Sequence, residues 1–443
     1  MTALLPRRLV PILALLIAAC TAAPAPSPDP STQPSPASTV AATAPATAAP
    51  TVSPSVPSPS ASPVPPPSPR ASAPPTAPPT LAPPPSPGPT TSGAPVDAQL
   101  ETRLRDALEE ERRARGIPGM AAVVVFPDGS QWAAGAGDAD LGSGQDAAPD
   151  TPFVIGSITK TFVGALVLQL VDEGLLELDA PLAGWLPDYP GARDISLRQL
   201  LNHTSGVFNY FEHPRYDSLV FGGPEETWTV QQILNRFRRP PTFAPGQGFR
   251  YSNTGFILLG LVAEQVTGNS LGAELRTRFF EPLGLDDTYF QGDGPPSPPE
   301  SAQGYLRRQS GYREISDGSA YRPTTSAATV AWAAGAIVSS AYDLATWGRA
   351  LYGGDVLSPE SLAEMVDVRA TPHASGTYGL ATRTRLFQGV RAFGHTGSLR
   401  GFMAVVWHIP TDNVTITVLT NLGRFDVNRI ADRLAGIVLP TLP

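Results

Sequence analysis

The sequence predicts a mixed α/β domain in which an antiparallel sheet is flanked by terminal and other helices and interrupted by an inserted all-α lobe. Three observations support this prediction. Strand patterns occur near both ends of residues 97–443, helical patterns fill the middle, and an amphipathic helical pattern lies at each terminus. Strands distant in sequence would close into one sheet, with the terminal helices packed on it.

The N-terminal elements of this domain are a helix and a hairpin. Leucines recur every four residues in 96–115, which indicates an amphipathic helix. Two strand-like runs, 121–126 and 130–135, are separated by Pro127, Asp128 and Gly129, which predicts a β-hairpin.

Helices dominate the middle and strands return at the end. Helical patterns cover 157–172, 196–201, 229–237, 253–266, 271–280, 340–351 and 359–366, and a Pro/Gly-rich loop covers 291–300. Predicted strands are 378–386, 391–395, 402–409 and 414–420, and a closing helix is 427–438.

The first residues predict export. Arg7 and Arg8 precede a short apolar run, 9–19, which has the form of a secretory signal. The run ends at Cys20, the only cysteine of the chain, and resembles the lipobox of bacterial lipoproteins, with Ile17 as a departure from the usual leucine. We expect 1–20 to be a lipoprotein-type signal peptide with Cys20 lipidated; an ordinary signal peptide or an uncleaved anchor are the alternatives.

A linker separates this leader from the domain. Residues 21–96 are rich in Pro, Ala, Ser and Thr, with few charges, and cannot bury a core, so they predict a disordered, extended tether. We therefore expect the domain 97–443 to be extracytoplasmic, in the cell envelope, held to the membrane by the lipid anchor only.

Charge and histidine spacing exclude several functions. The formal net charge of −8 offers no basic face for nucleic acid. The five histidines show no close pairing with acidic residues of the kind that binds zinc, so no metal and no cofactor are predicted. We expect a monomer.

Lys160 is the only lysine among 31 basic residues. Arginine stays protonated at ordinary pH, whereas a desolvated lysine can lose its proton and act as a base. Ser157 lies one helical turn before Lys160, at a helix start where free N–H groups favour an oxyanion. The pair predicts an activated serine nucleophile.

Two further motifs strengthen this prediction. Tyr251-Ser-Asn253 lies in a turn before a helix, so that the tyrosine and the asparagine can both face a cleft. Gly394-His-Thr-Gly-Ser398 lies on a strand, where glycine would let a substrate approach the backbone.

These three motifs, in this order, resemble Ser-x-x-Lys, Tyr-x-Asn and (Lys/His)-Thr-Gly of the penicillin-recognising serine hydrolases. The chain is similar to the class C β-lactamase and D-alanyl-D-alanine carboxypeptidase branch, which includes esterases and D-amino-acid peptidases. Segments 200–206, 244–246 and 281–285 also resemble this family, so the likeness covers most of 97–443.

The resemblance implies catalytic roles. Ser157 would attack a carbonyl and carry the acyl group. Lys160 and Tyr251 would share acid–base duty, with a nearby lysine ammonium favouring a tyrosinate, and either of them could take the serine proton. Asn253 would bind Lys160 and a substrate amide. The backbone N–H groups of Ser157 and Ser398 would form the oxyanion hole.

The resemblance also implies that His395, Thr396 and Gly397 line the substrate pocket. Class C β-lactamases usually carry a lysine in place of His395, whereas histidine resembles the carboxypeptidase and esterase members and has a charge that depends on pH. Arg383, Arg385 or Arg391 could bind a substrate carboxylate, and strand parity alone does not distinguish them.

A second serine motif is present but fits its context poorly. Gly268-Asn-Ser270-Leu-Gly272 matches the nucleophile elbow of α/β-hydrolases, which requires a preceding strand. The residues before it have a helical pattern, so we interpret it as a helix–helix turn capped by Ser270.

The sequence therefore predicts a tethered serine hydrolase that works through an acyl-enzyme on D-amino-acid peptides or small esters. One alternative is a serine β-lactamase with fast deacylation. An alternative of another class is a non-catalytic cell-wall-binding or sensory module with the same fold.

Overall fold

The computed structural model describes residues 96–292, 297–298, 300–371 and 377–442. These residues fall within one unit of the chain, Thr76–Pro443. The predicted signal peptide, the lipidation site Cys20 and the linker up to residue 95 lie outside the described residues, as does part of the predicted loop 291–300.

A seven-stranded antiparallel sheet forms the centre of this unit, in the order β3-β2-β1-β12-β11-β10-β9. The N-terminal hairpin pairs with the last strand, with Val123 opposite Thr417. The strands are β1 (Gly119–Val125), β2 (Gln131–Asp140), β3 (Gln145–Asp146), β9 (Arg383–Phe387), β10 (Val390–Leu399), β11 (Phe402–Ile409) and β12 (Val414–Thr420).

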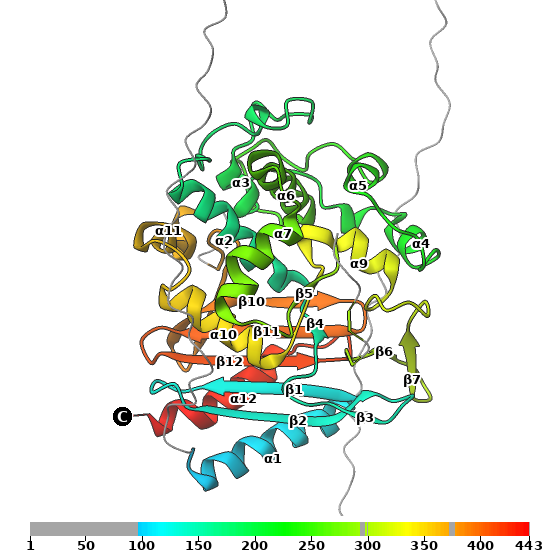
Figure 1. Cartoon of the computed structure of the whole chain (residues 1–443), viewed down its shortest axis with the longest axis vertical. Helices are drawn as coiled ribbons and strands as arrows, with labels where there is room; N and C mark the ends of the chain where they lie inside the picture. Colours follow the sequence, from blue (N-terminus) through cyan, green and yellow to red (C-terminus); the bar gives the residue numbers. More distant parts are fainter. Residues whose placement is uncertain (1–95, 293–296, 299, 372–376, 443) are drawn as a thin grey trace, which may run out of the picture. The chain divides into compact units, whose positions relative to one another are not determined.

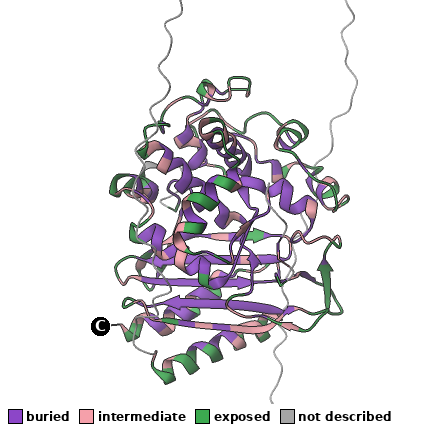
Figure 2. Cartoon of the chain, viewed as in Figure 1, coloured by how far each residue is buried: buried purple, intermediate pink, exposed green. Residues whose placement is uncertain are grey.

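Successive side chains of a strand point to opposite faces of the sheet, and each face is covered by its own hydrophobic core. Along β1, Met120 and Val124 pack with the terminal helices α1 (Ala98–Arg115) and α12 (Asn428–Val438), and Val123 packs with the larger core on the other face. Figure 1 shows α10 in front of β11 and β12, α1 and α12 at the β1–β2 end of the sheet, and most of the remaining helices beyond β10. The strands of the sheet are largely buried, whereas α1 carries many exposed residues (Figure 2).

The larger layer contains the helical lobe. Helix α10 (Ala341–Gly353) packs on β1, β11 and β12, and α2 (Thr159–Asp172) packs between β10 and α6 (Asn253–Thr267). The other helices are α3 (Leu197–Leu201), α4 (Tyr216–Val220), α5 (Val230–Arg236), α7 (Leu271–Leu275), α8 (Glu281–Leu283), α9 (Thr325–Ala331) and α11 (Pro359–Val366).

Two small sheets connect the layers. One has the order β4 (Phe153–Val154), β8 (Ile337–Ser339), β5 (Tyr289–Phe290), and the other pairs β6 (Gly304–Arg307) with β7 (Tyr312–Ile315). Strand β4 leads directly into the turn that carries Ser157, so the first small sheet fixes the start of that turn.

The predicted fold is confirmed, with local differences. The predicted strand 378–386 is wrong in its first half, because only Arg383–Phe387 pairs with β10. Gly268 ends α6 with φ of 74° and Ser270 caps α7, so the second serine motif is a helix–helix turn, as predicted. No helix in the described part of the chain is long and apolar enough to cross a bilayer.

Candidate active site

Ser157 lies in a single 3₁₀ turn, Gly156–Ile158, that leads straight into α2. A serine at this position has free backbone N–H groups around it, because the first N–H groups of a helix have no partner within the helix. The predicted helix start near Ser157 is therefore confirmed.

Lys160 is fully buried on the first turn of α2. Its Nζ atom lies 3.2 Å from Ser157 Oγ, 2.8 Å from Asn253 Oδ1 and 2.6 Å from the backbone oxygen of Ala334. Burial, and secondarily the Arg383 cation, hold the pKa of Lys160 well below its ordinary value. A neutral amine has two N–H groups for the two oxygens and one lone pair for the serine hydroxyl.

Tyr251 approaches the same amine from the start of α6, with its ring centroid 5.1 Å from Lys160 Nζ. Its hydroxyl is buried and forms no hydrogen bond of normal geometry within the described residues. Burial raises the pKa of Tyr251 to about 12, although Arg383 and the Ser157 hydroxyl favour the ionised form. The phenol is thus protonated at neutral pH, which is opposite to the tyrosinate that the resemblance implied.

Asn253 is held from the side opposite to Lys160. Its Nδ2 and backbone N–H both donate to Asn209 Oδ1, at 3.1 and 3.2 Å. These bonds orient the Asn253 amide so that its oxygen faces Lys160. Asn209 was not predicted as a site residue.

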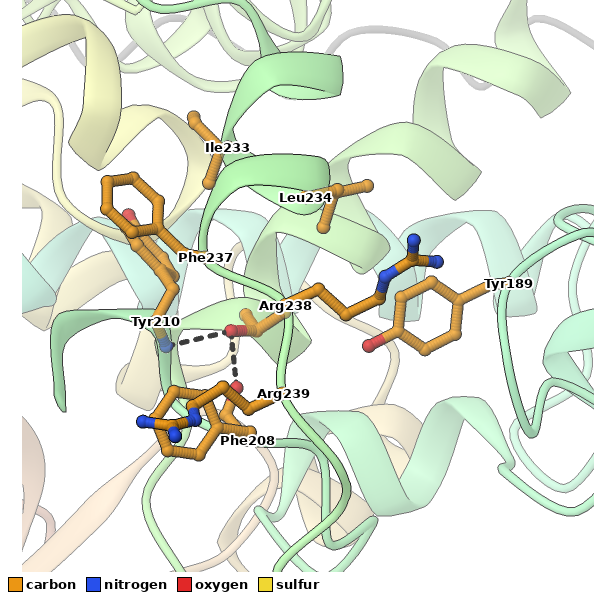
Figure 3. A pocket seen from close by; sticks show the side chains of 9 residues that line it. Tyr189, Phe208, Tyr210, Ile233, Leu234, Phe237, Arg238 and Arg239 are labelled. Atoms are coloured by element: carbon orange, nitrogen blue, oxygen red, sulfur yellow. Dashed lines mark hydrogen bonds between the residues drawn. The ribbon is translucent and has the colours of Figure 1, made fainter. Parts of the chain in front are cut away.

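The loop that carries Asn209 is fixed by Thr254, which accepts a hydrogen bond from Tyr210 N and donates one to Phe208 O. Figure 3 shows these bonds beside a pocket formed by the loop and α5. With a volume of about 20 Å³, this pocket has room for one water molecule and none for a substrate.

Strand β10 and the Ser157 turn approach each other closely through two glycines. A Cβ atom on Gly156, whose φ is 52°, would lie 2.7 Å from the amide nitrogen of Ser398. A Cβ atom on Gly397 would lie 1.8 Å from the oxygen of Ile155. Gly397 is buried, and the absence of a side chain there makes room for the oxygen of Ile155. The contact brings the Ser398 amide beside the Ser157 turn.

His395 is fully buried, with both ring nitrogens occupied. Nδ1 lies 2.6 Å from the Thr396 oxygen and Nε2 lies 3.2 Å from Tyr378 Oη. Burial, with Arg383 and Lys160 nearby, holds the pKa of His395 well below its ordinary value. The expected pH-dependent charge is therefore not available at neutral pH, and the imidazole does not line an open pocket; Thr396 beside it is partly exposed.

The hydroxyl of Tyr378 also lies 3.0 Å from His203 Nε2, and His203 Nδ1 accepts a hydrogen bond from Ser252 N. These contacts allow only one direction of donation: Ser252 N–H to His203, His203 to Tyr378, Tyr378 to His395, and His395 to Thr396 O. Two neutral histidines thus connect the Tyr251–Asn253 turn to β10. We name this series of hydrogen bonds the histidine relay.

Of the three candidate arginines, Arg383 faces the site. Its guanidinium lies 5.3 Å from the Tyr251 ring centroid, and its Nε atom is buried without a hydrogen bond among the described residues. Arg385 instead forms two bonds to Asp432 on α12, at 2.9 and 2.5 Å. Arg391 is exposed near the far end of β10.

No group of three His, Cys, Asp or Glu side chains in the described ranges is arranged to hold a metal ion. One of the five histidines, His373, lies outside those ranges.

The sheet, the helical lobe and the pair formed by Ser157 and the buried Lys160 together define a class, the serine hydrolases of β-lactamase-type fold. The chain belongs to the Beta-lactamase family, whose profile matches residues 104–438.

Individual relatives share this fold and vary in activity. The chain is 30% identical to unguisins hydrolase ungD' of Aspergillus campestris, over 74% of this chain and 62% of that protein, which is less than two thirds of the relative's length. It is 29% identical to penicillin-binding protein 4 of Amycolatopsis lactamdurans, over 72% of this chain and 84% of that protein. The structure of a D-stereospecific amidohydrolase from Streptomyces sp. superposes with a TM-score of 0.67 and 30% identity, over 77% of this chain and 99% of that one.

Proposed function

We propose that the chain hydrolyses the terminal amide bond of D-amino-acid peptides that end in a free carboxylate, through an acyl-enzyme on Ser157. The observation that carries this proposal is the fully buried Lys160, whose Nζ lies 3.2 Å from Ser157 Oγ and whose pKa burial holds well below its ordinary value. The placement of Arg383 beside Tyr251 supports the carboxylate, and the likeness to a D-stereospecific amidohydrolase supports the D configuration.

The geometry favours Lys160 as the base in acylation. As Ser157 Oγ bonds to the carbonyl carbon, its proton passes to the lone pair of Lys160 Nζ, while Asn253 and Ala334 hold the two N–H groups. The N–H groups of Ser157 and Ser398 stabilise the oxyanion. Protonated Tyr251 donates to the leaving nitrogen and is reprotonated from Lys160, and water then releases the acyl group from Ser157.

The leaving group would lie at the Arg383 end of the site. Tyr251 protonates the leaving nitrogen, and the Arg383 guanidinium lies against the face of the Tyr251 ring. A carboxylate beyond that nitrogen can bind the guanidinium, whose Nε has no partner among the described residues.

A peptide pair tests this proposal. An N-acylated D-Ala-D-Ala with a free carboxylate should be cleaved faster than its C-terminal carboxamide. On the alkaline plateau of the pH profile, Arg383→Gln should lower kcat/KM for the acid about tenfold with little effect on the amide. Arg391→Gln, an exposed control, should leave both rates unchanged, and Ser157→Ala should abolish them. Equal rates on both peptides in the wild type would overturn the proposed substrate.

The β-lactam alternative is supported by the relation to penicillin-binding protein 4. β-Lactams should acylate Ser157, because the same base and oxyanion donors serve their amide bond. Fluorescent penicillin should label the wild type and leave Ser157→Ala unlabelled. Rapid multiple turnover of nitrocefin would favour a β-lactamase, whereas stable labelling with peptide or ester hydrolysis would favour the peptidase. Absence of labelling and of all hydrolysis would favour a non-catalytic module.

We further propose that the domain is extracytoplasmic and anchored through a lipid on Cys20, on the strength of the leader alone. The wild type should enter the detergent phase on phase separation and Cys20→Ala should stay in the aqueous phase; equal partitioning would contradict the anchor. A single peak of monomer mass on size-exclusion chromatography would support the predicted monomer.

A further inference from the structure

A pocket of about 220 Å³ adjoins the oxyanion side of the site. Ser398, whose amide lies beside the Ser157 turn, forms part of its wall, with Arg400 next along the chain. Phe211, Tyr216 and Phe221 form the opposite wall, from the segment around α4. We name this space the Ser398 pocket.

The pocket is positively charged. Arg400 and Arg424 line it against a single lining carboxylate, that of Asp217. Burial lowers the pKa of Arg400 below its ordinary value, Asp217 raises it, and the nearby cations Arg313, Arg424 and Arg308 lower it further. Neither lining arginine forms an ion pair with another described residue. Cations crowded together in this way favour binding of an anion.

Two buried hydrogen-bond donors of residues that line the pocket have no partner among the described residues. Arg400 packs over Phe221 with its guanidinium carbon 4.0 Å from the ring centroid, and its Nε is buried without an acceptor in the described part of the chain. Tyr216 is 5% exposed, and its hydroxyl is also buried without a partner there. Both atoms are closed off from the surface, so a ligand in the pocket would meet the outer nitrogens of the partly exposed Arg400 guanidinium.

The position of the pocket assigns it to the acyl half of a substrate. Arg383 pairs with Gly394 at one end of the site, and Arg400 follows Leu399 at the other. Gly394 and Arg400 are six residues apart along β10 and its turn, roughly 20 Å at about 3.3 Å per residue. The leaving group lies toward Arg383 and Tyr251, so the acyl group extends past Ser398 toward Arg400.

We propose that the Ser398 pocket binds acyl groups that carry a carboxylate, with Arg400 as the residue that determines this specificity. The Arg400 guanidinium donates to the carboxylate, and Phe211 and Phe221 cover the carbon chain. This proposal rests on the proposed function, because it assumes acyl transfer to Ser157.

Two p-nitrophenyl esters of equal chain length test it in the full chain. The monoglutarate ester differs from the valerate ester by a terminal carboxylate in place of a methyl group. We expect kcat/KM to favour the glutarate in the wild type, and Arg400→Gln to reduce the glutarate-to-valerate ratio about tenfold while valerate hydrolysis is kept. Arg391→Gln, the exposed control, should keep the wild-type ratio. A wild-type preference for valerate, or an unchanged ratio in Arg400→Gln, would overturn the proposal.

A binding measurement separates this proposal from the proposed function. Ser157→Ala should bind glutaric acid monoanilide about tenfold more tightly than valeranilide by titration calorimetry, and adding Arg400→Gln should remove the difference. Wild type that hydrolyses neither ester would contradict the proposed function, and the calorimetric difference would still support an anion-binding pocket. Equal binding of the two anilides would overturn that pocket even if both esters are hydrolysed.

Discussion

Asn253 Oδ1 accepts a 2.8 Å hydrogen bond from Lys160 Nζ in the protein interior. Together with the oxygen of Ala334, this bond uses both N–H groups of a neutral amine and leaves its lone pair for Ser157. All Lys and Arg positions of the chain except Lys160 are arginines, and the one lysine lies at the place where loss of a proton is required.

Replacing Lys160 by arginine should abolish most activity. The guanidinium does not deprotonate, so general base catalysis is lost and kcat/KM for p-nitrophenyl acetate should fall about 10²- to 10⁴-fold. Circular dichroism should show a folded protein. Activity close to that of the wild type would rule out Lys160 as the base.

The pH dependence of acylation should follow Lys160. Burial holds the pKa of Lys160 below its ordinary value, and the protonated amine is inactive, so the rate rises with pH through this pKa and then levels off. Arg383→Gln removes a cation that disfavours protonated Lys160. The pKa of Lys160 then rises, and the acid limb should move to higher pH.

The shift of the acid limb is measured as kcat/KM against pH with p-nitrophenyl acetate. This ester has no carboxylate, so the loss of a binding partner at Arg383 does not affect its rate. Arg391→Gln should give the wild-type profile. An acid limb that stays in place, or moves to lower pH, in Arg383→Gln would contradict the electrostatic link.

Tyr378→Phe tests the histidine relay. Loss of the hydroxyl leaves Nε2 of His203 without an acceptor and Nε2 of His395 without a donor, both in the interior. We expect the free energy of unfolding in urea to fall by about 2 kcal/mol. We also expect kcat to fall with little change in KM, because the relay positions Tyr251. An unchanged free energy of unfolding would mean that the two hydrogen bonds of the Tyr378 hydroxyl make no net contribution to stability.

Gly397→Ala should disrupt the oxyanion hole. The added methyl group would overlap the Ile155 oxygen, so β10 and the Ser157 turn must separate and the Ser398 amide moves. Loss of one oxyanion donor typically lowers kcat about 10²- to 10³-fold. Gly353→Ala, at a position where an added Cβ meets nothing within 4 Å, is the matched control. A folded Gly397→Ala variant with full acylation by fluorescent penicillin would contradict this role.

Local patterns predicted most of the fold. The hairpin, the helix after Ser157 and strands β11 and β12 were predicted because each has its own periodicity or turn. Strands β4, β5 and β8 were not, because runs of two or three residues carry no period. Helix α9 was also missed, as its small residues Thr325–Ala331 give no amphipathic pattern.

The reacting side chains were predictable because their chemistry restricts residue type, as with Ser157, Lys160 and Tyr251. The residues that position these side chains through hydrogen bonds were not predictable. Ala334 acts through a backbone oxygen, which any residue has, and Asn209 and Tyr378 act across sequence distances that no local pattern records. His203 lay within a segment noted for its likeness to the family, and that likeness was the only available signal for it.

The pairing of β1 with β12 has a consequence for synthesis of the chain. The ribosome completes Ser157, Lys160 and Asn253 long before it makes Ser398, and β12, the strand that joins β10 and β11 to the N-terminal hairpin, comes later still. A nascent chain that ends before β12 contains the Ser157 nucleophile, but its β10–β11 strands cannot yet pair with the N-terminal hairpin through β12. Activity should therefore appear only after β12 has been made and paired.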